Sequence, residues 1–118
     1  MTDLIACVSI GKGTWNEVYS LIDSGEFENI YLVVNSIVRD RFSTNKAVKM
    51  IIIDPNSDIN LIIDEINSSL QGRINDLEVA LNLASGTGKE HMAILSAALK
   101  LGIGIRLVSW KNKQLKEL

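Results

Sequence analysis

The sequence predicts an α/β domain with a mostly parallel sheet of five strands and helices on both faces of the sheet. Short apolar runs rich in Ile and Val, typical of strands buried on both faces, recur along the chain. Segments with apolar residues at helical spacing separate these runs, and glycine, proline or small polar residues mark the junctions. Strands and helices therefore alternate as in a Rossmann-like three-layer sandwich with right-handed crossovers.

The first strand is expected over residues 4–10, because this apolar run stops abruptly at Gly11. The first helix should follow at once. Thr14 and Glu17 have the spacing of a capping box, and the apolar residues after them recur at helical spacing until Gly25.

Two more strands are expected in the middle of the chain, over residues 30–34 and 48–53, which are short and dominated by Ile and Val. Residues 36–47 between them give the least distinct pattern of the chain. Residues 54–57 form a turn sequence, and the apolar stripe of residues 59–70 then predicts the second clear helix.

The last third of the chain repeats the alternation. Residues 77–83 predict the fourth strand, and the small and glycine residues at 85–88 break it before an Ala- and Leu-rich helix. Gly102 ends that helix, and residues 103–110 predict the fifth strand. The tail at 111–118 is too short for another module.

Length and composition indicate one globular domain over residues 1–118, because the hydrophobic share is 47% and the charged share 22%. The net charge of -2 disfavours binding to duplex DNA or to an anionic membrane. One cysteine, Cys7, and one histidine, His91, make neither a disulfide nor a Cys/His metal site. No apolar run approaches the roughly 20 residues that cross a bilayer. We expect a cytoplasmic protein without cofactor or metal.

Two glycine-bearing loops follow the first and fourth strands, at the edge where open α/β sheets bind their ligands. Each contains two glycines and one lysine: Gly11, Lys12 and Gly13 in the first loop, and Gly86, Gly88 and Lys89 in the second. Glycine lets the backbone approach a ligand, and lysine can neutralise phosphate charge beside the free amides of a helix N-terminus. Together the loops could hold one anionic ligand.

A purely structural interpretation of the same loops stays open. Both end in the capping-box pattern, Thr14 with Glu17 and Thr87 with Glu90. Capping boxes satisfy the free helix amides internally, and Glu90 adds negative charge near the expected phosphate position.

Specific nucleotide motifs are absent from both loops. Asn16 occupies the place of the third glycine of the dinucleotide fingerprint. Leu83 stands where a P-loop has its first glycine, and Glu90 replaces the Ser or Thr that holds magnesium. Dinucleotide enzymes and P-loop ATPases are therefore disfavoured.

Residues 82–89, Asn-Leu-Ala-Ser-Gly-Thr-Gly-Lys, lead into a helix and the strand around residues 102–108, and this region resembles the signature of CARF domains. These are CRISPR-associated Rossmann-fold domains, whose fourth strand typically ends in Asn, a Thr or Ser, paired glycines, Thr and Lys. Their first strand ends in a Ser- and Gly-containing loop, as residues 9–14 do here. Gly88 stands where the family's lysine usually stands, so Lys89 aligns with a one-residue insertion.

The resemblance implies a homodimer whose strand-end loops form one two-fold pocket for a cyclic oligoadenylate, the second messenger of type III CRISPR antiviral signalling. An isologous dimer matches the symmetry of such a ring. The implied ligand contacts are Ser9, Gly11, Lys12, Gly13 and Thr14 in the first loop and Ser85, Gly86, Thr87, Gly88 and Lys89 in the second. Members usually carry a fused effector for which 118 residues leave no room, so we expect a separate effector protein as a further partner.

Whether the ligand would also be cleaved stays open. Some family members are ring nucleases that hold a ribose 2'-hydroxyl in line with its phosphate and need no metal. The residues to test for such slow cleavage are Ser9, Lys12, Ser85 and Lys89, but no histidine or carboxylate pair supplies a general base. The alternatives are a generic Rossmann-like protein that binds a mononucleotide or a phosphorylated metabolite, and a protein-interaction module without ligand.

Three features outside the loops also have two interpretations. Trp15 could stack on a base, but at its helical spacing we favour packing in the core or a dimer interface. The basic residues between 39 and 49 could approach a nucleotide or lie in solvent. His91, in a first helical turn, is expected to be exposed.

Overall fold

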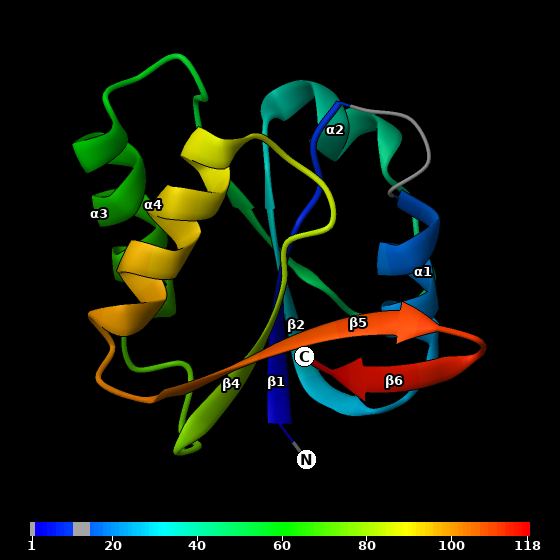
Figure 1. Cartoon of the computed structure of the whole chain (residues 1–118). Coiled ribbons are helices and arrows are strands. Elements are labelled where there is room, and N and C mark those ends of the chain that lie inside the picture. Colours follow the sequence, from blue (N-terminus) through cyan, green and yellow to red (C-terminus); the bar gives the residue numbers. More distant parts are fainter. Residues whose placement is uncertain (1, 11–14) are drawn as a thin grey trace.

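The computed structural model describes residues 2–10 and 15–118 and shows an α/β fold in which six strands form one sheet (Figure 1). The strands are β1 (Thr2–Cys7), β2 (Phe27–Val34), β3 (Lys49–Ile52), β4 (Glu78–Asn82), β5 (Gly104–Lys111) and β6 (Gln114–Glu117). The helices are α1 (Trp15–Asp23), α2 (Ser36–Arg41), α3 (Ile59–Leu70) and α4 (Gly88–Leu99).

The strands lie in the order β3-β2-β1-β4-β5-β6, and the first five are parallel to their neighbours. The mostly parallel sheet is therefore confirmed, and β1 pairs directly with β4, with Ile5 opposite Leu81. The prediction of five strands is wrong. β6 returns antiparallel to β5 through a two-residue turn at Asn112 and Lys113, whose positive φ angles are those of a type I′ hairpin turn.

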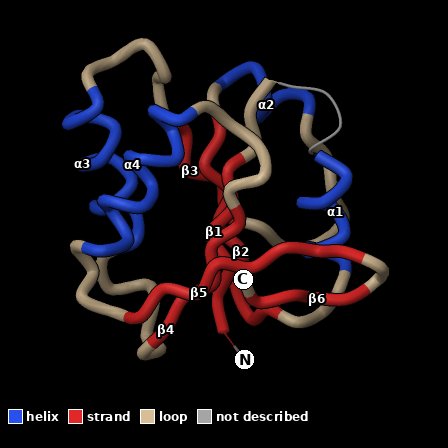
Figure 2. Tube along the Cα trace, in the orientation of Figure 1, coloured by secondary structure: helices blue, strands red, loops and turns tan. Residues whose placement is uncertain are grey.

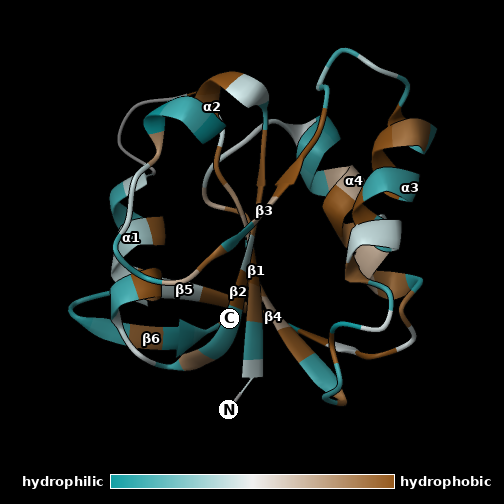
Figure 3. Cartoon of the chain, turned by 180° about the vertical axis from the view of Figure 1, so that it is seen from behind, coloured by the Kyte–Doolittle hydropathy of each residue, from teal (hydrophilic) through white to brown (hydrophobic). Residues whose placement is uncertain are grey.

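The sheet separates two hydrophobic cores, with α3 and α4 on one face and α1 and α2 on the other (Figure 2). Strand β1 contributes to both: Ile5 and Cys7 point into the first core, and Leu4 and Ala6 into the second. All four residues are fully buried. Burial on both faces explains why this strand is an unbroken apolar run, and Figure 3 shows hydrophobic residues on the strands and on both groups of helices.

Helix α2 lies in the segment that gave the least distinct pattern. Asn35 begins it, because its side-chain oxygen accepts a hydrogen bond from the Val38 N–H at 2.8 Å. Val38 is the one residue of this short helix that is buried. Within residues 2–10 and 15–118, no helix has the length and apolar character needed to cross a membrane.

Candidate functional site

The candidate site lies where β1 and β4 end side by side. β1 leads into α1 on one face of the sheet, and β4 leads into α4 on the opposite face. After two adjacent parallel strands, the chain therefore crosses to opposite faces of the sheet. This arrangement defines the topological switch point of an open α/β sheet. Ligands in such sheets bind at this point, beyond the carboxyl ends of the strands.

The structure brings two of the predicted site residues together here. The backbone N–H of Ser9 donates a 2.9 Å hydrogen bond to Oγ of Ser85, and both residues are buried. On its other side, Ser9 accepts through its carbonyl a 2.7 Å hydrogen bond from Nε1 of Trp15. The loop after β1 is therefore joined to the loop after β4. Trp15 also packs edge-on against Phe42, in agreement with the packing role that we favoured.

Gly86 gives the second loop its shape. Its φ of +116° is a conformation that L side chains rarely adopt, and a Cβ there would lie 2.7 Å from Sγ of Cys7 and 2.9 Å from Nε2 of His91. The loop backbone thus passes directly over the end of β1. Burial, followed by the negative charge of Glu90, raises the pKa of the Cys7 thiol, so this sulfur stays protonated and is not a nucleophile.

His91 is not the exposed residue that its helical position suggested. Its side chain reaches back over the loop, and Nε2 donates a 2.7 Å hydrogen bond to the carbonyl of Ser85. The proton therefore resides on Nε2, because a carbonyl can only accept. Since α4 begins three residues after Ser85, the histidine fastens the loop to the first turn of its own helix.

The capping box at the start of α4 is confirmed. Oε1 of Glu90 accepts from the Thr87 N–H at 2.8 Å, and Oγ1 of Thr87 accepts from the Glu90 N–H at 3.2 Å. The backbone N–H groups of Gly88 and Lys89 lie between these two, and neither has a hydrogen-bond partner within the described part of the chain. The capping box therefore pairs the first and last of these four consecutive N–H groups and leaves the two between them as donors at the helix N-terminus.

The ammonium group of Lys89 lies on the turn before α3. Nζ donates to the carbonyl of Ser57 at 2.6 Å and to that of Pro55 at 3.0 Å. This turn also contains Asp54, which accepts through Oδ1 from the Asn56 N–H, as expected of a turn residue. Lys89 therefore connects the β4–α4 loop to the neighbouring β3–α3 loop at the same edge of the sheet.

One polar network at this edge was missed by the sequence analysis. Nδ2 of the buried Asn82 donates to Oε2 of Glu17 at 2.7 Å and to the carbonyl of Val108 at 2.9 Å, so it ties α1 and β5 to the end of β4. Glu17 had been expected to cap α1 together with Thr14. The signal that could have found the network is an asparagine that directly follows the buried apolar residues 79–81 at the end of β4.

Four predicted site residues, Gly11, Lys12, Gly13 and Thr14, lie outside the described residues. Where the structure describes the chain, no group of three His, Cys, Asp or Glu side chains is arranged to hold a metal ion. No protein-family model matches the chain, and no curated protein matches it. The chemistry of the site therefore rests on its residues: hydroxyl groups engaged in internal bonds, two amide donors and one lysine.

Proposed function

We propose that this chain is a Rossmann-like domain of the CARF type, which binds a cyclic oligoadenylate at a homodimer interface in type III CRISPR antiviral signalling. The observation that carries the proposal is the contact between the loops after β1 and β4 at the switch point, made by the hydrogen bond from Ser9 to Ser85. These are the loops to which the resemblance assigns the ligand. Strand order and helix placement support the three-layer arrangement of such a domain.

The phosphates of the ring would meet the first turn of α4. The amides of Gly88 and Lys89 supply two hydrogen-bond donors there, and Gly86 keeps side-chain atoms away from the backbone. Lys89 would exchange its bonds to two neutral carbonyls for one to a phosphate oxygen. A hydrogen bond to a charged group is worth about 1.5–3 kcal/mol, more than a bond between neutral partners.

An apolar stripe on α4 supports the homodimer. Met92, Leu95 and Leu99 are spaced by three and four residues and are 63%, 37% and 61% exposed. Proteins seldom leave such a stripe in water without a partner. Since α4 starts at the candidate loop, a second copy packed on this stripe around a two-fold axis would bring both copies of the loop to one pocket.

The internal bonds of the site support binding more than cleavage. The hydroxyl of Ser85 accepts from Ser9, and Nε2 of His91 donates to a carbonyl, so both groups hold the loop in its present conformation. We therefore propose a receptor for the ring that acts through a separate effector protein, with product analysis as the test for slow cleavage.

The test is calorimetric titration of the purified protein with cyclic tetraadenylate and cyclic hexaadenylate, with linear tetraadenylate and AMP as controls. We expect one ring bound per two chains, a dimer in light scattering, and weaker binding of the linear form. AMP bound at one molecule per chain would instead indicate a mononucleotide-binding protein. Failure of both rings and of AMP to bind would leave the protein-interaction alternative.

A further inference from the structure

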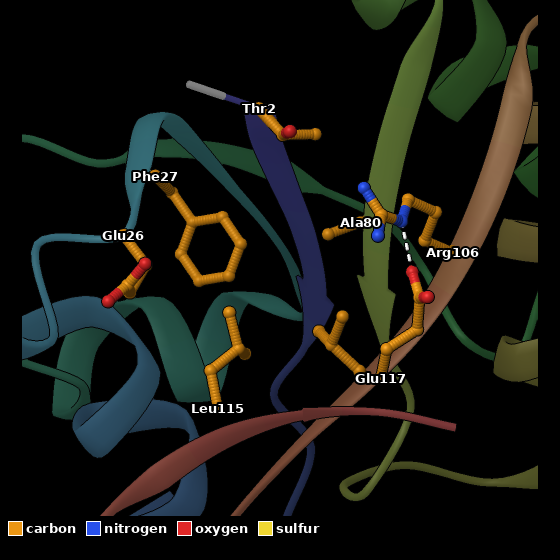
Figure 4. A pocket seen from close by; sticks show the side chains of 8 residues that line it. Thr2, Glu26, Phe27, Ala80, Arg106, Leu115 and Glu117 are labelled. Atoms are coloured by element: carbon orange, nitrogen blue, oxygen red, sulfur yellow. Dashed lines mark hydrogen bonds and ion pairs between the residues drawn. The ribbon is translucent and has the colours of Figure 1, made fainter.

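A pocket of about 360 Å³ lies on the face of the sheet that carries α1, between the starts of β1 and β2 and the β5–β6 hairpin (Figure 4). Thr2 and Phe27, at the starts of β1 and β2, line one side of it, and the β5–β6 hairpin lines the other. Its volume falls within the range of about 300–1,000 Å³ that is typical of small-molecule sites. None of the residues that line it belongs to the candidate loops, so an inference about this pocket does not rest on the function proposed above.

The inner surface of this pocket is apolar. Ala80 and Val108, both buried in the sheet, contribute to it, and Phe27 and Leu115 add a ring and a branched side chain. The surface remains open on this side because β5 turns directly into β6, so within the described chain no helix follows β5 to cover it. An apolar group placed there would leave water, which favours binding.

The charges around the pocket have a negative excess. Glu26 and Glu117 line it together with Arg106, and Arg106 pairs both with Glu117 and, at 3.3 Å, with Glu78. The lining itself has two carboxylates and one guanidinium, a net charge of −1, and Glu78 outside the lining is a further carboxylate beside Arg106. The hydrogen bond from Arg106 lowers the pKa of the Glu117 carboxyl, so this group is ionised at neutral pH.

We infer that this pocket binds an organic cation with an apolar body, a primary alkyl- or arylalkylammonium ion, either free or as the side chain of a lysine in a peptide. The apolar body would lie against Phe27 and Leu115, and the ammonium group would face the carboxylates of Glu26 and Glu117. The ring of Phe27 attracts a cation as well as an apolar stem. An anion would meet an arginine that already has two carboxylate partners.

The experiment uses phenethylammonium as the probe and 3-phenylpropionate as an anion of similar shape, followed by the methyl NMR signals of Ala80, Val108 and Leu115. We expect the cation to shift all three signals and to bind at least fivefold more tightly than the anion. N-acetyl-lysine methylamide distinguishes the two sources of the ammonium group, since tighter binding than phenethylammonium indicates a peptide. Equal or tighter binding of the anion, or methyl signals unmoved by the cations, would overturn the proposal.

Arg106→Gln is the decisive variant, because the loss of a positive charge should strengthen the binding of a cation. Freeing the carboxylates of Glu78 and Glu117 should tighten phenethylammonium binding about two- to fivefold, as expected for charge contacts near solvent. Lys111→Gln removes the same charge at the end of β5 and should have no effect.

Two variants fill the pocket, Thr2→Phe at its rim and Ala80→Leu on its inner surface. Each variant that keeps the wild-type circular dichroism spectrum should no longer bind phenethylammonium. Weaker binding in Arg106→Gln would refute the inference, and titration with the cyclic ring should be unchanged in this variant.

Discussion

The hydroxyl oxygen of Ser85 lies 2.9 Å from the backbone nitrogen of Ser9, 76 positions earlier in the chain, and accepts its hydrogen bond. The donor is a main-chain group, so every residue type at position 9 except proline could supply it, whereas the acceptor requires the side chain at position 85. The join between the two loops of the candidate site therefore depends on one hydroxyl.

Replacing that hydroxyl should cost stability. In Ser85→Ala the buried N–H of Ser9 loses its acceptor, and we expect the free energy of unfolding to fall by about 1–3 kcal/mol in urea denaturation. Ser43→Ala, at an exposed position, should stay within about 0.5 kcal/mol of wild type. Equal stability of the two variants would show that the hydrogen bond contributes nothing.

The two glycines around Thr87 should respond in opposite directions. Gly86→Ala forces a side chain into a φ of +116° and against the Cys7 sulfur, so we expect a loss of about 2 kcal/mol or more in unfolding free energy. Gly88→Ala puts a Cβ into open space at the start of α4 and should gain about 0.5–1 kcal/mol. Thermal and urea unfolding of both variants would measure the difference, and losses of similar size in both would contradict it.

Lys89 tests the ligand proposal. Its bonds to Pro55 and Ser57 are exposed, so Lys89→Ala should lower the unfolding free energy by no more than about 1 kcal/mol. The loss of a charged phosphate contact should weaken binding of the cyclic ring roughly tenfold to a hundredfold, equivalent to about 1.5–3 kcal/mol. Lys116→Ala, on the exposed β6, removes the same charge and should bind like wild type. If Lys89→Ala binds the cyclic ring with wild-type affinity, the only role of Lys89 is to connect the β4–α4 loop to the β3–α3 loop.

The buried thiol predicts a pH dependence of stability. The folded state holds the pKa of Cys7 above its ordinary value of 9.0, so above about pH 9 the unfolded chain has lost a proton that the folded chain retains. The contribution of Cys7 to stability is therefore complete below pH 9 and declines as the pH rises, by up to about 1.4 kcal/mol per pH unit. Urea denaturation between pH 8 and 10 should give a steeper decline for wild type than for Cys7→Ala. Parallel declines would mean that the thiol ionises equally in both states.

The clearest sequence signals came from elements that are buried on a whole face. The runs around Ile5, Leu32 and Leu81 were identifiable as strands because they are apolar on both sides, and the stripe of α3 because four of its residues are buried. α2 and β6 gave no such signal. Val38 alone is buried in the first, and Leu115 is the sole apolar residue of the second.

The candidate site could be placed from the sequence but its contacts could not. Glycines after two strands indicated which loops meet, because the carboxyl ends of parallel neighbours share an edge. The partners of Lys89 are backbone carbonyls 32 and 34 positions away, and Asn82 reaches Glu17 across 65 positions. Local patterns carry no information about such pairs, which depend on how the strands are ordered in the sheet.

The β5–β6 hairpin changes what the rim of the sheet can do. If the sheet stopped at β5, its edge strand would have eight residues with unpaired backbone groups, and a strand of another chain could pair with them. Instead the last strand has four residues, is antiparallel, and carries Lys116 and Glu117. Short charged rims resist the open-ended stacking that produces fibrils. The hairpin thereby protects this rim of the sheet against the addition of a strand from another chain.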